Sequence, residues 1–91
     1  MGLRTIVEDQ RFKTERDTIS PNIARWDEVQ KGVIWGLSRK PERVGKPTEA
    51  DGIFAVATDD WPDVPSVVIY YTFDDKTVIL KSVILASVPE A

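Results

Sequence analysis

Two apolar segments near the end of the chain predict a β-hairpin. Residues 67–73 and 77–85 are dense in β-branched and aromatic residues, and Asp74, Asp75 and Lys76 lie between them as a polar turn. Both segments are apolar with almost no alternation, which indicates that both faces of these strands are largely covered. We therefore expect the hairpin to lie inside a sheet with a helix packed on one side.

A second pattern, with apolar residues every three or four positions, predicts an amphipathic helix over residues 22–39. Ser20-Pro21-Asn22 is a helix-start signal, because Ser20 or Asn22 can cap the first N–H groups and proline is tolerated in the first turn. Ile34 and Trp35 widen the apolar stripe. The residues that we expect to face the sheet are Trp26, Val29, Val33 and Leu37.

Gly32 and Gly36 lie one turn apart on one side of this predicted helix. They either permit close approach to the sheet or are simple helix-weakening residues. Both interpretations stay open on the sequence alone.

The remaining segments complete a strand, helix, strand, strand, strand order. Residues 4–14 alternate loosely with charges on both faces, as is typical of an edge strand. Pro41 and Pro47 end the helix and begin a loop, residues 53–58 form an apolar strand, and residues 59–65 form an acidic, proline-stiffened connection. The whole pattern predicts one α+β domain over residues 1–91, a small, mostly antiparallel sheet with one face covered by the amphipathic helix.

Composition narrows the available chemistry. The 91 residues include no cysteine and no histidine, so disulfides, thiolate or imidazole metal ligands and the usual neutral-pH general base are excluded. Asp59, Asp60 and Asp63 around Trp61 have the composition of a hard-cation loop, but their spacing matches no known cage and a rigid loop explains them. We expect neither a metal site nor a cofactor.

No apolar run approaches the roughly 20 residues of a membrane span, and no signal-peptide core follows the first residues. We therefore expect a cytoplasmic protein without membrane contact.

The formal net charge of −3 hides an asymmetry between the two halves of the chain. Residues 1–46 carry a net charge of +3 and residues 47–91 a net charge of −6. The acidic total argues against a dedicated nucleic-acid binder but leaves room for one local positive patch. Four cations at the predicted helix end either converge on a phosphate backbone or are solvated charges favoured by the helix dipole: Arg39, Lys40, Arg43 and Lys46.

Three aromatic residues are candidates for binding. Tyr70 and Tyr71 are adjacent in a strand and point to opposite faces, so one joins the core and the other is available to stack on a base. Trp61 either folds back onto the edge of the core or anchors a partner protein.

Residues 26–42 (WDEVQKGVIWGLSRKPE) followed by residues 67–80 (VVIYYTFDDKTVIL) resemble the RelE/ParE superfamily of type II toxin–antitoxin systems. In that family a helix closed by an Asn/Lys-Pro type of stop precedes a hydrophobic strand that ends in tyrosine, an acidic turn and a second hydrophobic strand. The resemblance covers residues 22–87. It implies a small antiparallel sheet with helical packing on one face and a cognate antitoxin as partner. For RelE-like members it implies ribosome-dependent cleavage of messenger RNA, and for ParE-like members binding to gyrase.

The chain departs from the RelE-like pattern at two positions that carry its chemistry. Many RelE-like members have an arginine where this chain has Val67, and a basic residue where it has Ser87. The weak catalytic candidates that remain are Tyr71 and Lys81, with Tyr70 and Lys76 as further candidates. Tyr71 and Lys81 can act together only if the strand register places both side chains on the open face of the sheet. The expected catalytic arginines are thus absent, and a poor ribonuclease is predicted.

We therefore expect a toxin-like component of a type II toxin–antitoxin system that acts by binding a partner protein. The alternatives are a ribosome-dependent mRNA interferase and a non-toxin α+β interaction protein. The corresponding partners are an antitoxin, the ribosome with its messenger RNA, or gyrase.

Overall fold

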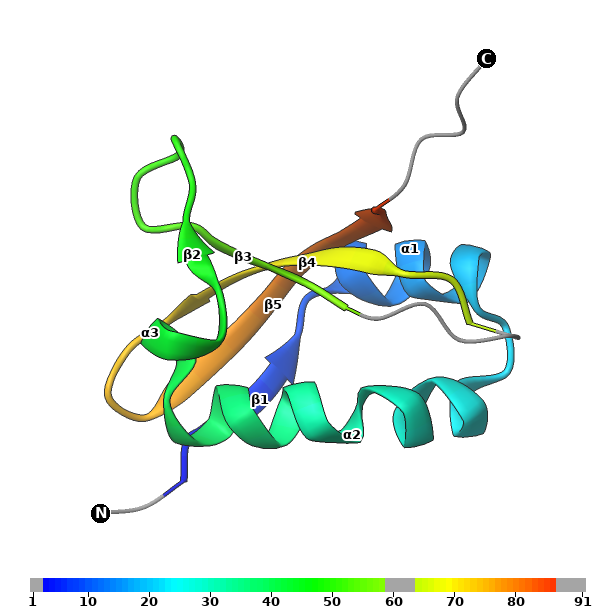
Figure 1. Cartoon of the computed structure of the whole chain (residues 1–91), viewed down its shortest axis with the longest axis horizontal. Helices are drawn as coiled ribbons and strands as arrows, with labels where there is room; N and C mark the ends of the chain where they lie inside the picture. Colours follow the sequence, from blue (N-terminus) through cyan, green and yellow to red (C-terminus); the bar gives the residue numbers. More distant parts are fainter. Residues whose placement is uncertain (1–2, 59–63, 87–91) are drawn as a thin grey trace.

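The computed structural model of the chain describes residues 3–58 and 64–86. Five strands form one sheet in the order β1-β5-β4-β3-β2, and every pairing is antiparallel except that of β1 with β5 (Figure 1). The elements are β1 (Thr5–Glu8), α1 (Gln10–Ile19), α2 (Ile23–Arg39), α3 (Pro41–Val44), β2 (Lys46–Pro47), β3 (Phe54–Ala57), β4 (Val67–Phe73) and β5 (Thr77–Leu85). The predicted α+β fold with a mostly antiparallel sheet is confirmed.

The hairpin β4–β5 has the predicted limits. Its turn is held by Asp74, whose Oδ1 accepts hydrogen bonds of 2.8 Å from the N–H groups of both Lys76 and Thr77. These two bonds, with help from Arg4, hold the pKa of Asp74 below its ordinary value. The register shifts between Tyr70 and Tyr71, which leaves Lys81 as the extra residue of a β-bulge.

The first strand is shorter than the sequence predicts. β1 lies at the sheet edge as expected, but it ends at Glu8, and the predicted continuation to residue 14 is wrong because residues 10–19 form α1. Phe12, Arg16 and Ile19 recur at helical spacing on α1, and Phe12 is fully buried with its ring edge-on to Trp26 at 6.4 Å. This burial on a helical face outweighs the loose alternation.

α2 begins as predicted, with Asn22 Oδ1 accepting a hydrogen bond of 3.1 Å from Arg25 N–H. The predicted sheet-facing stripe is confirmed, since Trp26 and Leu37 are buried and Val29 and Val33 pack against the core. The expectation that Trp35 widens this stripe is wrong. Its side chain is 59% exposed, with the Arg39 guanidinium 4.5 Å from the ring centroid.

The predicted loop after α2 contains the single turn α3 and the short strand β2. Tyr71 fixes this segment to the sheet, because its hydroxyl donates a hydrogen bond of 2.6 Å to the carbonyl of Pro41. Gly45 packs so closely that an added Cβ would collide with the Ala55 carbonyl and lie 2.6 Å from the Tyr71 hydroxyl. The segment is therefore ordered by its contacts with β3 and β4.

The two helical glycines have different surroundings. A Cβ added at Gly36 would lie 3.0 Å from Val44 Cγ2, whereas one at Gly32 would meet nothing within 4 Å. Gly36 thus permits close approach of α3 rather than of the sheet.

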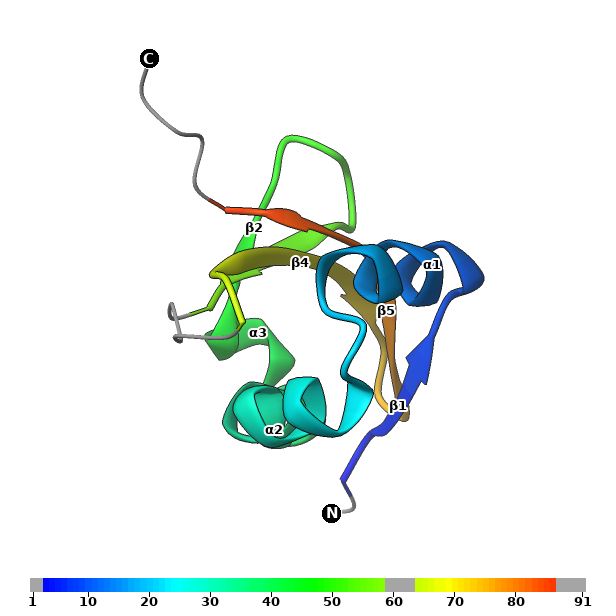
Figure 2. The same cartoon turned by 90° about the vertical axis from the view of Figure 1, so that its right-hand side faces the viewer.

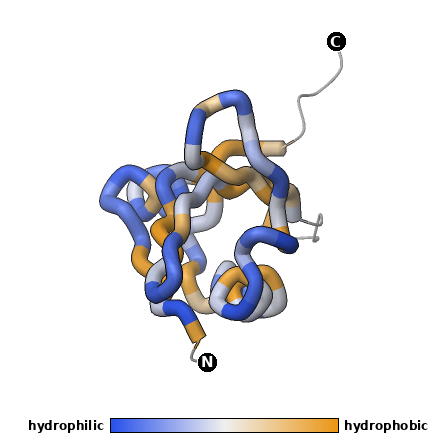
Figure 3. The backbone as a smooth tube through the Cα atoms, turned by 90° about the vertical axis from the view of Figure 1, so that its left-hand side faces the viewer, coloured by the Kyte–Doolittle hydropathy of each residue, from blue (hydrophilic) through white to orange (hydrophobic). Residues whose placement is uncertain are grey.

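Helices and sheet form two layers. α2 and α3 lie on one side of the curved sheet, and α1 lies beside β5 (Figure 2). The hydrophobic positions follow the strands, while the connecting segments are mostly hydrophilic (Figure 3). The core between the layers includes Phe12, Trp26 and Leu37 from the helices, and Ile69, Tyr71 and Leu80 from the strands. On the opposite face of the sheet, the contact that a described helix is seen to make is at Ser82, whose hydroxyl donates a hydrogen bond of 2.6 Å to Glu15 of α1.

Candidate functional site

The open face of the sheet is apolar. On β4, Val67, Ile69 and Tyr71 are buried toward the helices, so the alternate side chains point to the other face. Strand pairing extends this open face onto β5, β3 and β1. Its members are Val68, Tyr70, Thr72, Ile79, Ser82, Ile84, Ala55, Ala57 and Val7.

The two catalytic candidates of the sequence do not lie together. Tyr71 is completely buried on the covered face, where loss of solvation raises the pKa of its hydroxyl above the ordinary value and the Glu42 charge adds to the effect. Lys81 lies at the exposed bulge, with its Nζ 3.2 Å from Asp9 Oδ2. Tyr71 therefore supports the fold, while Tyr70 is the tyrosine on the open face.

The basic segment lies at one end of the molecule. Its four cations are all exposed, on the last turn of α2, its cap, α3 and β2: Arg39, Lys40, Arg43 and Lys46. Arg39 stacks on Trp35, and its carbonyl accepts a hydrogen bond of 3.0 Å from Arg4 Nη1. Lys40, Arg43 and Lys46 make no ion pair within the described part of the chain, so nucleic-acid contact stays a prediction.

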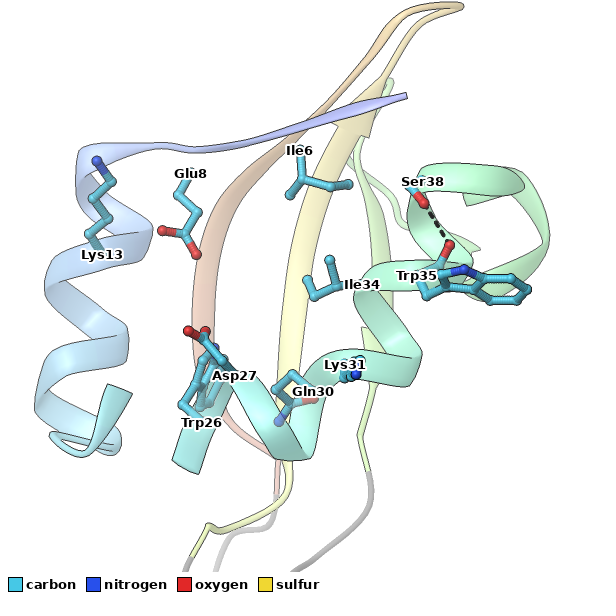
Figure 4. Close-up of a pocket in the computed structure, with 10 residues that line it drawn as sticks. All are labelled: Ile6, Glu8, Lys13, Trp26, Asp27, Gln30, Lys31, Ile34, Trp35 and Ser38. Atoms are coloured by element: carbon cyan, nitrogen blue, oxygen red, sulfur yellow. Dashed lines mark hydrogen bonds between the residues drawn. The ribbon is translucent and has the colours of Figure 1, made fainter. Parts of the chain in front are cut away.

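A groove that the sequence did not reveal lies between α2 and β1 (Figure 4). Its volume is about 610 Å³. Ile6, Trp26 and Ile34 supply apolar lining, and Gln30 supplies a carboxamide that is only 1% exposed. At one end Glu8 Oε2 lies 2.8 Å from Arg16 Nη1. The groove is thus an apolar slot with one buried amide.

The sequence signal for Gln30 is its place on the apolar stripe. It lies four residues after Trp26 and seven before Leu37, so it faces inward with them. A polar residue on such a stripe is a candidate for a specific contact.

Several sequence candidates lie outside the described residues: Trp61, the three aspartates around it and Ser87. Val67 is fully buried in the core. Within residues 3–58 and 64–86, no group of three or more potential ligands is placed to hold a metal ion. The helices in these ranges are too short or too polar to cross a membrane.

Comparison with known proteins identifies the fold. No protein-family model matches the sequence, and no curated protein matches it. Among solved structures, one chain in the crystal structure of the toxin–antitoxin complex RelBE2 from Mycobacterium tuberculosis matches with a TM-score of 0.67 and 25% identity. The match covers 89% of this chain and 95% of that chain. The chain therefore has the RelE-like α+β fold of a type II toxin–antitoxin system, as its sequence resemblance predicted.

Proposed function

We propose that this protein is the toxin-like component of a type II toxin–antitoxin system and acts by binding a partner protein rather than by cleaving RNA. The fold similarity to a chain of a toxin–antitoxin complex supports the first part. The apolar open face supports the second. Lys81 is the one cation in β4 and β5, and Asp9 already neutralises it.

Cleavage of a phosphodiester requires groups that stabilise the developing charge on phosphorus oxygens, and loss of one such group costs about 100- to 1,000-fold in rate. Tyr71 is buried with its hydroxyl bonded to Pro41, so it cannot supply this stabilisation. An apolar sheet face is instead suited to a protein partner. A cognate antitoxin is the partner that the fold similarity favours.

Induced expression of this protein in a bacterial host tests the proposal, with and without the gene that lies next to its own in the genome, where an antitoxin gene would be expected. We expect growth arrest that the adjacent gene relieves, without codon-specific cleavage of messenger RNA. Leu37→Asp, which puts a charge at a fully buried position and should unfold the protein, controls for the burden of overproduction when expressed at the same level. Codon-specific cleavage would support the interferase alternative, and growth without arrest or complex formation would support the non-toxin interaction protein.

The basic segment adds a separate proposal, weak contact with RNA. If all four cations met phosphates, the logarithm of affinity would fall with the logarithm of salt concentration with a slope of about −3. Filter binding at two salt concentrations measures this slope for the wild type and Arg43→Glu, with Lys13→Glu on α1, at the other end of the molecule (Figure 1), as the matched control. Equal, negligible retention of RNA by wild type and Arg43→Glu would reject the contact.

A further inference from the structure

The buried amide of Gln30 has no hydrogen-bond partner among the described residues. Both its Nε2 and its Oε1 are inaccessible and unpaired. A buried polar group without a partner is costly, and most such groups in proteins are satisfied. Gln30 therefore holds an unpaired donor and an unpaired acceptor just beneath the surface of the groove between α2 and β1, where an incoming group reaches them only after neighbouring side chains shift.

The backbone edge of β1 borders the same groove. Thr5 N–H and Asp9 N–H donate to the carbonyls of Lys76 and Leu80, each at 2.9 Å, so the odd-numbered residues turn their backbone groups toward β5. The amides and carbonyls of Ile6 and Glu8 consequently point to the outer edge. Among the described strands β1 pairs with β5 alone, so these outward groups have no strand partner there.

α2 closes this outer edge at only one end. The N–H of Arg4 points to the same side, and it donates a hydrogen bond of 2.8 Å to the carbonyl of Ser38, near the end of α2. Beyond that bond the edge stays open along Ile6 and Glu8, whose side chains both line the groove (Figure 4).

These features fit an extended peptide better than a compact ligand. A strand added to β1 would form backbone hydrogen bonds with Ile6 and Glu8, and every second side chain would enter the slot beside Ile6 and Ile34. One peptide group of such a strand presents the carbonyl and N–H that the Gln30 amide lacks.

The charged residues at the rim of the groove indicate which charge the bound peptide should carry. Glu8 is engaged by Arg16, whereas Lys13 and Lys31, on the two helices that flank the mouth, have no ion pair within the described chain. Asp27 is the one unpaired anion among the described lining residues. The surplus of free cations favours acidic residues beside the apolar ones.

We propose that the groove between α2 and β1 takes an extended apolar segment with acidic flanks, which adds to β1 as a strand and pairs one peptide group with Gln30. The inference rests on the proposed function for the source of the segment, the antitoxin-type partner.

Amide hydrogen exchange of the complex with the product of the adjacent gene tests this docking mode. We expect new protection at Ile6 and Glu8. A complex that protects the open face or β2 instead, with Ile6 and Glu8 unchanged, would overturn the inference while leaving the proposed function intact.

The variant Gln30→Leu provides a second test, because it should change the stability of the free protein and the strength of the complex in opposite directions. Removal of the unpaired amide should raise the melting temperature of the free protein, yet weaken the complex about tenfold, the change expected for loss of one or two hydrogen bonds. Glu49→Gln, an exposed residue in the loop between β2 and β3, is the matched control and should leave both the melting temperature and the complex unchanged. Undiminished binding by Gln30→Leu would overturn the pairing, and a lowered melting temperature would show that the amide serves the fold.

A synthetic peptide of alternating valine and threonine with glutamate at both ends separates failure of the inference from failure of the proposed function. If no complex forms with the product of the adjacent gene, binding of this peptide with protection of Ile6 and Glu8 would still support the groove. Absence of binding by both probes would reject it.

Discussion

The covered and open faces of the sheet are built from alternate residues of the same two strands, β4 and β5. Tyr71 on the covered face is fully buried and its hydroxyl is hydrogen bonded, whereas its neighbour Tyr70 on the open face is partly exposed and makes no side-chain hydrogen bond to the described residues. The two tyrosines are chemically identical. What separates a structural residue from one available for binding is the layer that lies over it, so substitutions matched across the two faces measure each role.

The largest difference is expected from a charge placed on either side of the sheet. Val33→Asp puts a carboxylate at a partly buried position on the stripe of α2 that packs against the core. An unpaired charge taken out of water costs several kcal/mol, against a total stability of about 5 to 10 kcal/mol. The variant should be unfolded in a thermal melt followed by circular dichroism. Ala57→Asp on the exposed face is the control and should melt cooperatively. An unchanged melt for Val33→Asp would refute the assignment of the helix face.

A smaller difference is expected between two glycines. Gly45→Ala forces a methyl group against the Ala55 carbonyl and the Tyr71 hydroxyl, and such overpacking costs about 1 to 3 kcal/mol. Gly32→Ala on the open side of α2 meets nothing within 4 Å and should stabilise the protein by up to about 1 kcal/mol. Denaturant unfolding measures both changes. Equal stability of the two variants would contradict the close packing at Gly45.

Removal of one hydroxyl oxygen from either Tyr71 or Tyr70 tests how the two faces of the sheet differ. Tyr71→Phe removes the donor to the buried Pro41 carbonyl and should cost about 1 to 2 kcal/mol. Tyr70→Phe should change stability by less than about 0.5 kcal/mol, as for an ordinary surface substitution. Urea unfolding of the two variants side by side provides the measurement, and a reversed order would show that the faces are assigned wrongly.

The smallest effect concerns Glu15, which joins the helical layer to β5. Burial alone would raise the pKa of its carboxyl, but hydrogen bonds of 2.6 Å from Ser82 Oγ and 3.0 Å from Val83 N–H, together with Arg11, hold it below the ordinary value of 4.5. A lowered pKa in the folded state stabilises the protein above about pH 4.5, and this stabilisation is lost as pH falls through the folded value.

Glu15→Gln should therefore reduce stability by less than about 1 kcal/mol at neutral pH and show a weaker decline in acid than the wild type. Unfolding free energies at neutral pH and at acid pH below the glutamate range give the comparison. Glu28→Gln, in an exposed pair with Arg25, is the control. Parallel pH curves for wild type and Glu15→Gln would contradict the role of this carboxylate.

Local patterns were sufficient for the hairpin and for α2. The dense β-branched segments on either side of Asp74 and the apolar stripe after Asn22 each determine their own structure, because the interactions that define them are short in sequence. α1 was missed because Phe12, Arg16 and Ile19 form a sparse helical stripe among charged residues, which also fits a loose alternation. The turn α3 was missed because its order comes from Tyr71, thirty residues away in the chain.

The site was less accessible to sequence analysis than the fold. The bulge at Lys81 separates it from Tyr71, and no local rule locates such an extra residue. Gln30 was visible as a polar residue on an apolar stripe, but its lack of a partner follows only from packing in three dimensions. Candidate binding residues were therefore identified by the three-dimensional arrangement of the residues around them rather than by residue type.

The parallel pairing of β1 with β5 has a consequence for synthesis of the chain. Residues 5–8 pair with residues 77–80. β1 therefore leaves the ribosome long before β5, the strand with which it pairs. During this delay the nascent protein carries an unmatched β-edge, and closure of the sheet requires a contact between distant parts of the sequence, which slows folding. Closure of the sheet therefore requires residues 77–80 to have left the ribosome, and a nascent chain stalled before residue 77 lacks the strand that pairs with residues 5–8.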